Sequence, residues 1–299
     1  MRLPGLRAAV VLISATIVLG ATLAGCQREE PSLRTDAPPR GSSSASLDVA
    51  GRERAYRLYL PPELSLAEPV ALVVMLHGGF GSAAQAEQGY GWNDHADRHG
   101  FVVAYPDGLG RAWAAGGGCC GDPGRDGVDD VGFIAAVVAN IGARLPVDPD
   151  RIFATGMSNG GMMSYRLGCD STLFAAIAPV TATMMGDCPA PRPLSLLHVH
   201  GLADERVRFD GEPGSGLARI DGPDVASVVD SWRSVGGCAA AITSTAGRVT
   251  TAEATCPEGR AVVLVIVAGA GHEWPGGTAS DGFDATDAIW RFFTSHPRS

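Results

Sequence analysis

Residues 151–166 read Arg-Ile-Phe-Ala-Thr-Gly-Met-Ser-Asn-Gly-Gly-Met-Met-Ser-Tyr-Arg. The first five residues form a short apolar run typical of a β-strand, and the segment from Met162 onward favours a helix. Between them lies Gly156-x-Ser158-x-Gly160, the pattern of a sharp strand-to-helix turn that exposes a serine. Side chains at positions 156 and 160 would collide with the neighbouring strand and helix. The stretch predicts Ser158 as a nucleophile at a helix N-terminus, with an ordinary strand–turn–helix corner as the alternative.

Strand-like runs alternate with helical segments along the rest of the chain. The runs cover residues 55–60, 70–76, 101–104, 152–155, 175–180, 194–199 and 261–267. The later runs are continuously apolar, as strands buried on both faces should be. This order predicts an α/β fold, with a mostly parallel central sheet, helices on both faces and a single domain. The segment 82–99 is expected to be helical, and 113–126 is expected to be a long irregular loop.

A glycine turn directly follows the buried run 70–76. It reads His77-Gly78-Gly79-Phe80. A glycine backbone N–H can approach a substrate oxygen closely, because no side chain is in the way. We therefore expect the N–H groups of Gly79 and Asn159 to form an oxyanion hole for Ser158. A plain glycine-rich turn is the alternative.

An acid and a base follow two later strand-like runs. Asp204 lies three residues past the end of one run at Gly201, and Glu205 and Asp210 are its competitors. His272 lies in a glycine-flanked loop after the run 261–267. The order Ser158, Asp204, His272 is that of the catalytic triad in α/β-hydrolases. We therefore predict the α/β-hydrolase fold and these three residues as its catalytic residues.

The other histidines are expected to have structural roles. His77 and His200 should hydrogen-bond to backbone groups, and His198, inside a strand, should be a satisfied core residue. His95, His99 and His296 are expected to be exposed. Asp129 and Asp130 precede an apolar helix and are interpreted as a helix cap and a partner of the helix dipole, not as catalytic groups.

The loops at 80–92, 108–128 and 205–222 are expected to shape the substrate pocket. Phe80 and Trp113 are candidate pocket residues. Trp113 is equally compatible with an anchor at the protein surface. The side chains in these loops do not give the pocket's volume, so the sequence does not name the substrate.

The N-terminal segment has the features of an export signal. Two arginines precede an apolar run from Ala8 to Ala24, which ends at Leu23-Ala24-Gly25-Cys26. This ending resembles the bacterial lipobox, in which Cys26 becomes the lipidated first residue of the mature chain. An ordinary signal peptide with a stray cysteine is the alternative. We expect a lipoprotein signal peptide over residues 1–25, a flexible tether over 26–46 and the catalytic domain over 47–299.

Charge and composition limit the partners. The formal net charge is −9. Removing residues 1–25 takes away two arginines and leaves −11, which argues against nucleic acid as a partner. All 23 basic residues are arginine, which suggests a GC-rich bacterial genome. The expected partners are an ester substrate and a membrane held through the Cys26 lipid; the oligomeric state is left open.

Six cysteines remain beside Cys26, an even number typical of disulfides in an exported protein. Cys238 and Cys256 bracket a short polar segment and are predicted to pair. A Cys169–Cys188 pair and a vicinal Cys119–Cys120 pair would complete the set, although six cysteines allow fifteen pairings. None of the cysteines has the spacing of a zinc site.

Seven motifs together resemble the polyhydroxybutyrate-depolymerase-like esterase family, which includes feruloyl and acetyl-xylan-type esterases. The motifs are Leu76-His77-Gly78-Gly79, Tyr105-Pro106-Asp107-Gly108, Gly118-Cys119-Cys120-Gly121, Val128-Asp129-Asp130-Val131-Gly132-Phe133, Gly156-Met157-Ser158-Asn159-Gly160-Gly161-Met162, His200-Gly201-x-x-Asp204 and Gly271-His272-x-Trp274-Pro275-Gly276. The resemblance covers roughly residues 46–295. The lipobox version is similar to lipoprotein esterases of mycobacteria and related actinobacteria.

This resemblance implies an exported, lipid-anchored or secreted bacterial serine esterase without metal or cofactor, in which Trp274 borders the acyl or alcohol pocket. Two departures from the family pattern matter. The sequence shows no added polymer-binding module, which favours small or oligomeric esters over insoluble polyester. Leu202 stands where relatives often have a small hydroxyl residue. The expected substrates are short-chain, hydroxyalkanoate-oligomer, hydroxycinnamoyl or acetyl esters. The alternatives are a serine peptidase or thioesterase on the same fold and a non-catalytic surface binding protein.

Overall fold

The computed structural model describes residues 37–216, 219–276 and 283–298, which belong to one compact unit, Arg34–Ser299. The predicted signal peptide, Cys26 and the tether up to residue 36 lie outside the described residues. Within the described residues, no helix is long and apolar enough to span a membrane.

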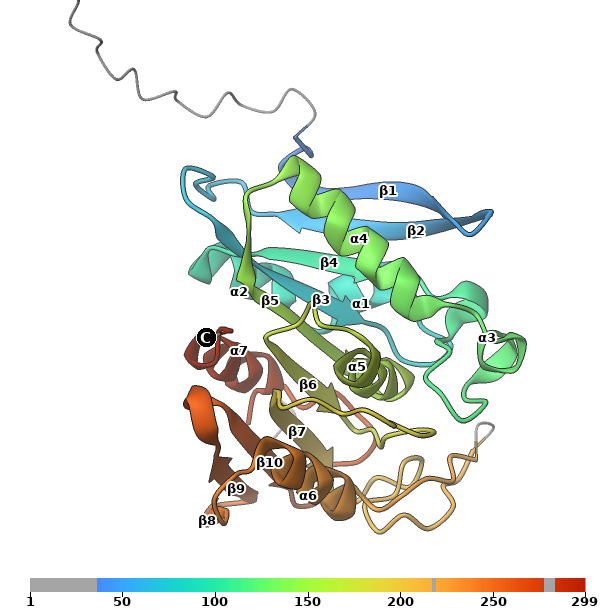
Figure 1. Ribbon diagram of the computed structural model, residues 1–299, viewed down its shortest axis with the longest axis vertical. Helices are drawn as coiled ribbons and strands as arrows, with labels where there is room; N and C mark the ends of the chain where they lie inside the picture. The colour runs from blue at the N-terminus through green and yellow to red at the C-terminus, as the bar shows by residue number, and fades with distance from the viewer. Residues whose placement is uncertain (1–36, 217–218, 277–282, 299) are drawn as a thin grey trace, which may run out of the picture. The chain divides into compact units, whose positions relative to one another are not determined.

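The described residues form one ten-stranded sheet (Figure 1). In order across the sheet, the strands are β1 (Gly41–Val49), β2 (Arg52–Leu60), β4 (Val102–Pro106), β3 (Val70–Leu76), β5 (Val147–Met157), β6 (Ala176–Val180), β7 (Ser195–Gly201), β10 (Ala261–Val267), β9 (Val249–Thr255) and β8 (Ile242–Ala246). The six central strands, from β4 to β10, pair in parallel, and antiparallel strands extend the sheet on both sides. The predicted α/β-hydrolase sheet, mostly parallel, is confirmed.

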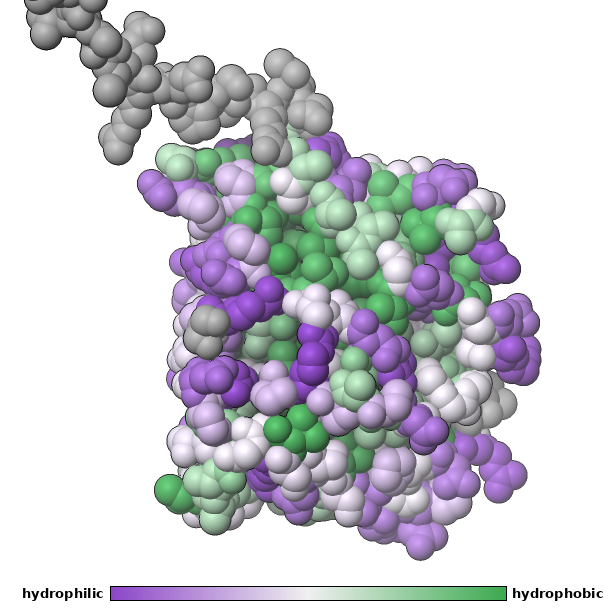
Figure 2. Space-filling model, viewed as in Figure 1, coloured by the Kyte–Doolittle hydropathy of each residue, from purple (hydrophilic) through white to green (hydrophobic). Residues whose placement is uncertain are grey.

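Helices cover both faces of the sheet, as predicted. One face carries α4 (Asp130–Arg144), α5 (Asn159–Asp170) and α6 (Val225–Gly236), whose apolar side chains share a buried cluster with the sheet. The other face carries α1 (Ala83–Gly89), α2 (Trp92–His99) and α7 (Ala285–Ser295) with a second cluster. The central strands β3, β4, β6 and β7 are buried along their whole length between these layers. On the face seen in Figure 2, apolar surface gathers over α4 and the neighbouring strands.

Three local predictions need correction. The predicted tether ends too late, because Gly41–Ser46 already belong to β1, an edge strand that packs Ala45, Leu47 and Val49 against the core. The single helix expected over 82–99 is two helices, interrupted at Gly91, whose φ of 71° is left-handed and ends helical continuity. The loop expected over 113–126 contains a short helix, α3 (Gly121–Asp126).

The cysteines pair as the sequence suggested. The structure contains the disulfides Cys238–Cys256, Cys169–Cys188 and the vicinal Cys119–Cys120. The second of these joins the end of α5 to the segment between β6 and β7. Disulfides of this kind persist in oxidising compartments.

Candidate active site

Ser158 occupies a strained turn between β5 and α5. Its φ of 54° and ψ of −120° lie outside the regions that a side chain normally allows. The turn is tight because glycines let backbones meet. A β-carbon on Gly156 would lie 2.5 Å from the carbonyl carbon of Gly160, and one on Gly160 would lie 2.3 Å from the Leu76 oxygen. The steric reason predicted for both glycines is confirmed.

The glycine turn after β3 lies against this elbow. A β-carbon on Gly78 would lie 3.7 Å from the Ser158 β-carbon, and one on Gly79 would lie 3.8 Å from the Asn159 β-carbon. Helix α5 begins at Asn159, so the N–H of this residue is one of the first-turn donors that have no partner within the helix. Gly79 and Asn159 are therefore brought together beside the serine, as an oxyanion hole requires.

Trp113 is buried and joins the glycine turn to Asn159; it does not line a cleft. Its side chain is 0% exposed, so the two roles predicted for it, pocket wall and surface anchor, are both wrong. Its backbone N–H donates to Asn159 Oδ1 (2.7 Å) and its carbonyl accepts from Asn159 Nδ2 (3.1 Å). Its indole N–H donates to the His77 carbonyl (2.8 Å). Trp113 thus ties the glycine turn to the first residue of α5.

Asp204 and His272 meet at the ends of β7 and β10. His272 Nδ1 lies 2.8 Å from Asp204 Oδ2. The other carboxylate oxygen, Oδ1, accepts the backbone N–H groups of Arg206 (2.8 Å) and Val207 (2.9 Å). The two loops are also joined by the backbone, because the Ala203 N–H donates to the Ala270 carbonyl (2.9 Å).

The environment of Asp204 favours its ionised form. Burial alone would raise the pKa of this carboxyl, but the His272 hydrogen bond and charge and the two backbone donors outweigh burial, and the net pKa is lowered. The carboxylate can accept only, so His272 Nδ1 carries the proton and its Nε2 lone pair is left free to act as a base.

The three predicted catalytic residues all follow the carboxyl ends of central strands of the sheet. Ser158 follows β5, Asp204 follows β7 and His272 follows β10, and these parallel strands all end at the same edge. The Ser158 hydroxyl makes no hydrogen bond to the described residues.

The remaining histidines mostly take the structural roles expected of them. His77 Nδ1 donates to the Gly78 carbonyl (2.8 Å), and its Nε2 accepts from the Gly108 N–H (2.9 Å). His200 bonds the Val207 carbonyl, and His198 is buried and satisfied by side chains. His95 and His296 differ from the prediction: His95 is only 6% exposed, packed beside Trp92, and His296 is half-buried with its Nδ1 2.7 Å from the Phe292 carbonyl.

Asp129 and Asp130 are structural, as expected. Asp129 caps α4, and its side chain accepts the Gly132 N–H (2.7 Å). Asp130 is buried and pairs with Arg54 (2.6 Å), whose guanidinium lies 3.8 Å from the centre of the Phe133 ring.

Apolar side chains border the candidate site. Phe80, directly after Gly79, is 65% exposed, and Leu202, two residues before Asp204, is 51% exposed. Trp274 is half-buried, packs against Tyr90 with ring centres 4.8 Å apart and donates to Thr286 Oγ1 (2.9 Å). Tyr90 and Trp274 line a hollow of about 360 Å³, and the Tyr90 hydroxyl reaches Met157, the neighbour of Ser158.

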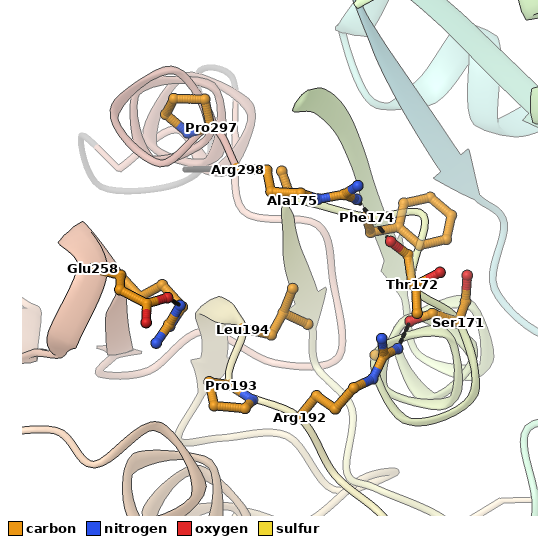
Figure 3. Close-up of a pocket in the computed structure, with 12 residues that line it drawn as sticks. Ser171, Thr172, Phe174, Ala175, Arg192, Pro193, Leu194, Glu258, Pro297 and Arg298 are labelled. Atoms are coloured by element: carbon orange, nitrogen blue, oxygen red, sulfur yellow. Dashed lines mark hydrogen bonds and ion pairs between the residues drawn. The ribbon is translucent and has the colours of Figure 1, made fainter. Parts of the chain in front are cut away.

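A second hollow, of about 410 Å³, lies at the amino ends of the central strands (Figure 3). Ala175, Leu194 and Arg260 line it, and they precede β6, β7 and β10. It therefore opens at the strand ends remote from Ser158 and is not part of the candidate site. Among the described residues, no cluster of three or more acidic, histidine or cysteine side chains could hold a metal ion.

The comparisons with known proteins agree with the fold and with the family resemblance. The family described as esterase PHB depolymerase matches residues 54–199. NocK of Nocardia uniformis subsp. tsuyamanensis, assigned as an esterase, is 33% identical over 84% of this chain and 79% of its own length. Feruloyl esterase B of Piromyces equi is 31% identical over 67% of this chain, and the matched part is 39% of that protein's own length. The acetyl xylan esterase from Aspergillus awamori has the same fold, with a TM-score of 0.63, 16% identity and coverage of 85% of this chain and 99% of its own.

The fold and the family define the class of protein as a carboxylic-ester hydrolase of the α/β-hydrolase fold. Within that class, the chain belongs to the polyhydroxybutyrate-depolymerase and feruloyl-esterase-like family. The resemblance noted in the sequence is confirmed.

Proposed function

We propose that the chain is a serine esterase in which Ser158, His272 and Asp204 form the catalytic triad. The observation that carries the proposal is the His272 Nδ1–Asp204 Oδ2 hydrogen bond of 2.8 Å. It lies at the sheet edge where β5 delivers the strained Ser158. A hydrogen-bonded acid and base, at the strand ends where a partly exposed serine also lies, is the arrangement that acyl transfer needs.

The reaction proceeds in two halves. Ser158 Oγ attacks the ester carbonyl carbon while His272 Nε2 takes the hydroxyl proton, and Asp204 stabilises the resulting imidazolium. The N–H groups of Gly79 and Asn159 bind the developing oxyanion. The C–O bond to the alcohol then breaks, and the alcohol leaves with the proton from His272. Water, activated by the same histidine, hydrolyses the acyl-enzyme and restores Ser158.

The substrates proposed are small or oligomeric esters: short-chain, hydroxyalkanoate-oligomer, hydroxycinnamoyl or acetyl esters. The family relationship and the exposed Phe80 near the oxyanion turn support an acyl or alcohol group with apolar surface. Phe80 and Trp274 are proposed to border the pocket. The three disulfides support an exported chain, and the Cys26 motif supports attachment to the membrane through a lipid.

A substrate panel tests the proposal. It holds p-nitrophenyl acetate, butyrate and octanoate, methyl ferulate and hydroxybutyrate oligomers, with an anilide and a thioester for the peptidase and thioesterase alternatives. We expect the chain to hydrolyse the esters and to be labelled at Ser158 by a fluorophosphonate probe. The member with the highest kcat/KM then selects the ester class.

The matched variant is Ser158→Ala, which removes one oxygen atom. It should lose ester hydrolysis and probe labelling while keeping the thermal unfolding of the parent. Hydrolysis that survives in this variant would show that another residue is the nucleophile. A parent chain that neither hydrolyses the panel nor reacts with the probe would support the binding-protein alternative.

A further inference from the structure

Three buried polar side chains form a row behind Asp204, and the proposed triad does not use them. Tyr165 comes from α5, and His198 and His200 come from one face of β7; all three are 0% exposed. Burial raises the pKa of the Tyr165 hydroxyl and lowers the pKa values of both histidines, with further lowering of the His198 pKa by His200. All three side chains are therefore neutral at neutral pH.

The distances allow one set of proton positions. His200 Nε2 lies 2.8 Å from the Val207 carbonyl, which can only accept, so Nε2 carries the proton and Nδ1 a lone pair. His198 Nε2 lies 3.0 Å from that lone pair and must donate to it. His198 Nδ1 is then an acceptor and receives the Tyr165 hydroxyl proton across 2.7 Å. The reverse orientation of the His198 tautomer would set two lone pairs against each other.

The row ends at Asp204. Val207 accepts from His200 with its carbonyl and donates to Asp204 Oδ1 with its N–H (2.9 Å), through the two successive peptide groups that flank its α-carbon. His200 Nε2 itself lies 3.7 Å from Asp204 Oδ2, the oxygen that His272 contacts. The O–H and N–H groups all point from Tyr165 toward this loop, so their dipoles add and present a positive end to the carboxylate.

We propose that Tyr165, His198 and His200 are positioning residues that hold Asp204 ionised and turned toward His272. The inference rests on the proposed triad and extends it by three residues on two further elements. The titratable groups that face His200 are Asp204, His198 and His272, and the edge of the Phe209 ring packs against it. Apolar side chains could fill this space without the free-energy cost of desolvating three polar groups. The presence of the three polar groups therefore favours a role in orienting the Asp204 carboxylate.

Three variants test by kinetics whether the row acts as a relay, that is, whether Tyr165 and His198 act on Asp204 through His200. His200→Leu removes the donor to Val207, and misplacement of the acid should lower kcat roughly tenfold to a hundredfold with little change in KM. His200→Gln keeps a donor at the position of Nε2 and should restore much of the loss. Tyr165→Phe removes the far end of the row and should lower kcat about two- to tenfold.

The double variant Tyr165→Phe/His200→Leu tests whether Tyr165 acts on Asp204 through His200, as in a relay, or whether each side chain affects kcat only through its own local packing. In a relay, Tyr165→Phe has no further effect once His200 is gone, so the two losses in kcat do not add. The control is Tyr105→Phe, because Tyr105 is equally buried and its hydroxyl donates to Asn93 (2.7 Å) away from the site. This control should reduce stability but leave kcat unchanged. Additive losses, or equal kcat in the Tyr165→Phe and Tyr105→Phe variants, would overturn the relay.

The proton positions can be read without any activity. In the ¹⁵N-histidine-labelled parent chain, His198 and His200 should both be neutral at neutral pH, with Nε2 protonated and Nδ1 unprotonated. Tyr165→Phe should shift the Nδ1 resonance of His198. A protonated Nδ1 on either ring would sink the proposal, even if the kinetic variants failed to fold. Absence of esterase activity with the expected tautomers would instead reject the triad while leaving the hydrogen-bonded row in place.

Discussion

The two halves of the candidate site are held by different means. The half with Ser158 and Gly79 is held mainly by backbone packing, since Gly156 and Gly160 leave no room for a β-carbon. The half with Asp204 and His272 is held mainly by side-chain hydrogen bonds. Substitutions in the backbone half should act mainly on the stability of the fold. The side-chain half should respond in steps that follow the number of hydrogen bonds removed.

The largest expected effect is on the side-chain half. Asp204→Asn should leave the fold intact but lower kcat by roughly 10⁴-fold, because an amide can hold the wrong imidazole tautomer of His272. Steady-state kinetics with p-nitrophenyl acetate, beside thermal unfolding, measures both effects. Glu205→Gln changes the neighbouring acid and should keep kcat near the parent value. A larger loss in the Glu205 variant would move the catalytic acid to that residue.

The backbone half should break by unfolding. Gly160→Ala places a β-carbon 2.3 Å from the Leu76 oxygen and 2.6 Å from the His77 oxygen. We expect it to lower the free energy of unfolding by about 3 kcal/mol, as overpacking does. Gly142→Ala in α4 is the control, since its β-carbon would meet nothing within 4 Å. Urea unfolding should show a gain of about 0.5–1 kcal/mol for this control; equal effects of the two substitutions would contradict the steric argument.

The buried histidines of the side-chain half should make stability depend on pH. Burial lowers the pKa values of His198 and His200 from 6.5 in the folded chain. Below that pH the unfolded chain binds more protons than the folded chain, so the free energy of unfolding falls as the pH falls. Each histidine contributes up to about 1.4 kcal/mol per pH unit.

Urea unfolding on either side of pH 6.5 measures this slope. His200→Gln removes one titrating ring and should make the slope shallower. A free energy of unfolding that is constant, or that rises toward acid pH, would mean that these rings are protonated in the folded chain.

The smallest expected effect is at Trp113, which joins the glycine turn after β3 to the first residue of α5. Trp113→Phe removes the indole N–H that donates to the His77 carbonyl. Trp232→Phe is a matched control, because Trp232 is also buried and its indole N–H has no partner among the described residues. We expect the Trp113 variant to lose about 1 kcal/mol more in urea unfolding than the control. Equal losses would show that the Trp113 hydrogen bond contributes nothing net.

The same contrast explains what the sequence could predict. The tight turn at Ser158 can be recognised from Gly156 and Gly160 themselves, because a close approach of backbones demands glycine wherever it occurs. Asp204 and His272 are visible because each follows an apolar strand. The proposed site residues that the sequence points to are those whose reason is local: a turn, a strand end or a spacing.

The features that the sequence did not predict depend on distant partners or weak patterns. Trp113 bonds Asn159 through its backbone, 46 positions away, and no local pattern marks such a contact. His198 and His200 did carry a signal, since residues two apart on a strand share a face, but Tyr165 lies 33 positions from His198. Strand β1 was missed because only its second half, from Ala45 to Val49, alternates between apolar and polar residues, while its first half is glycine and serine.

The order of the strands has a consequence for synthesis of the chain. Strand β10 is the last strand in sequence, yet it lies between β7 and β9 inside the sheet, and His272 follows it. An emerging chain that stops before residue 261 therefore has the serine elbow and the acid loop without the base. In the proposed mechanism such a chain cannot hydrolyse an ester, so the hydrolase becomes active only after His272 has been made and β10 has entered the sheet. The order of synthesis itself then delays activity.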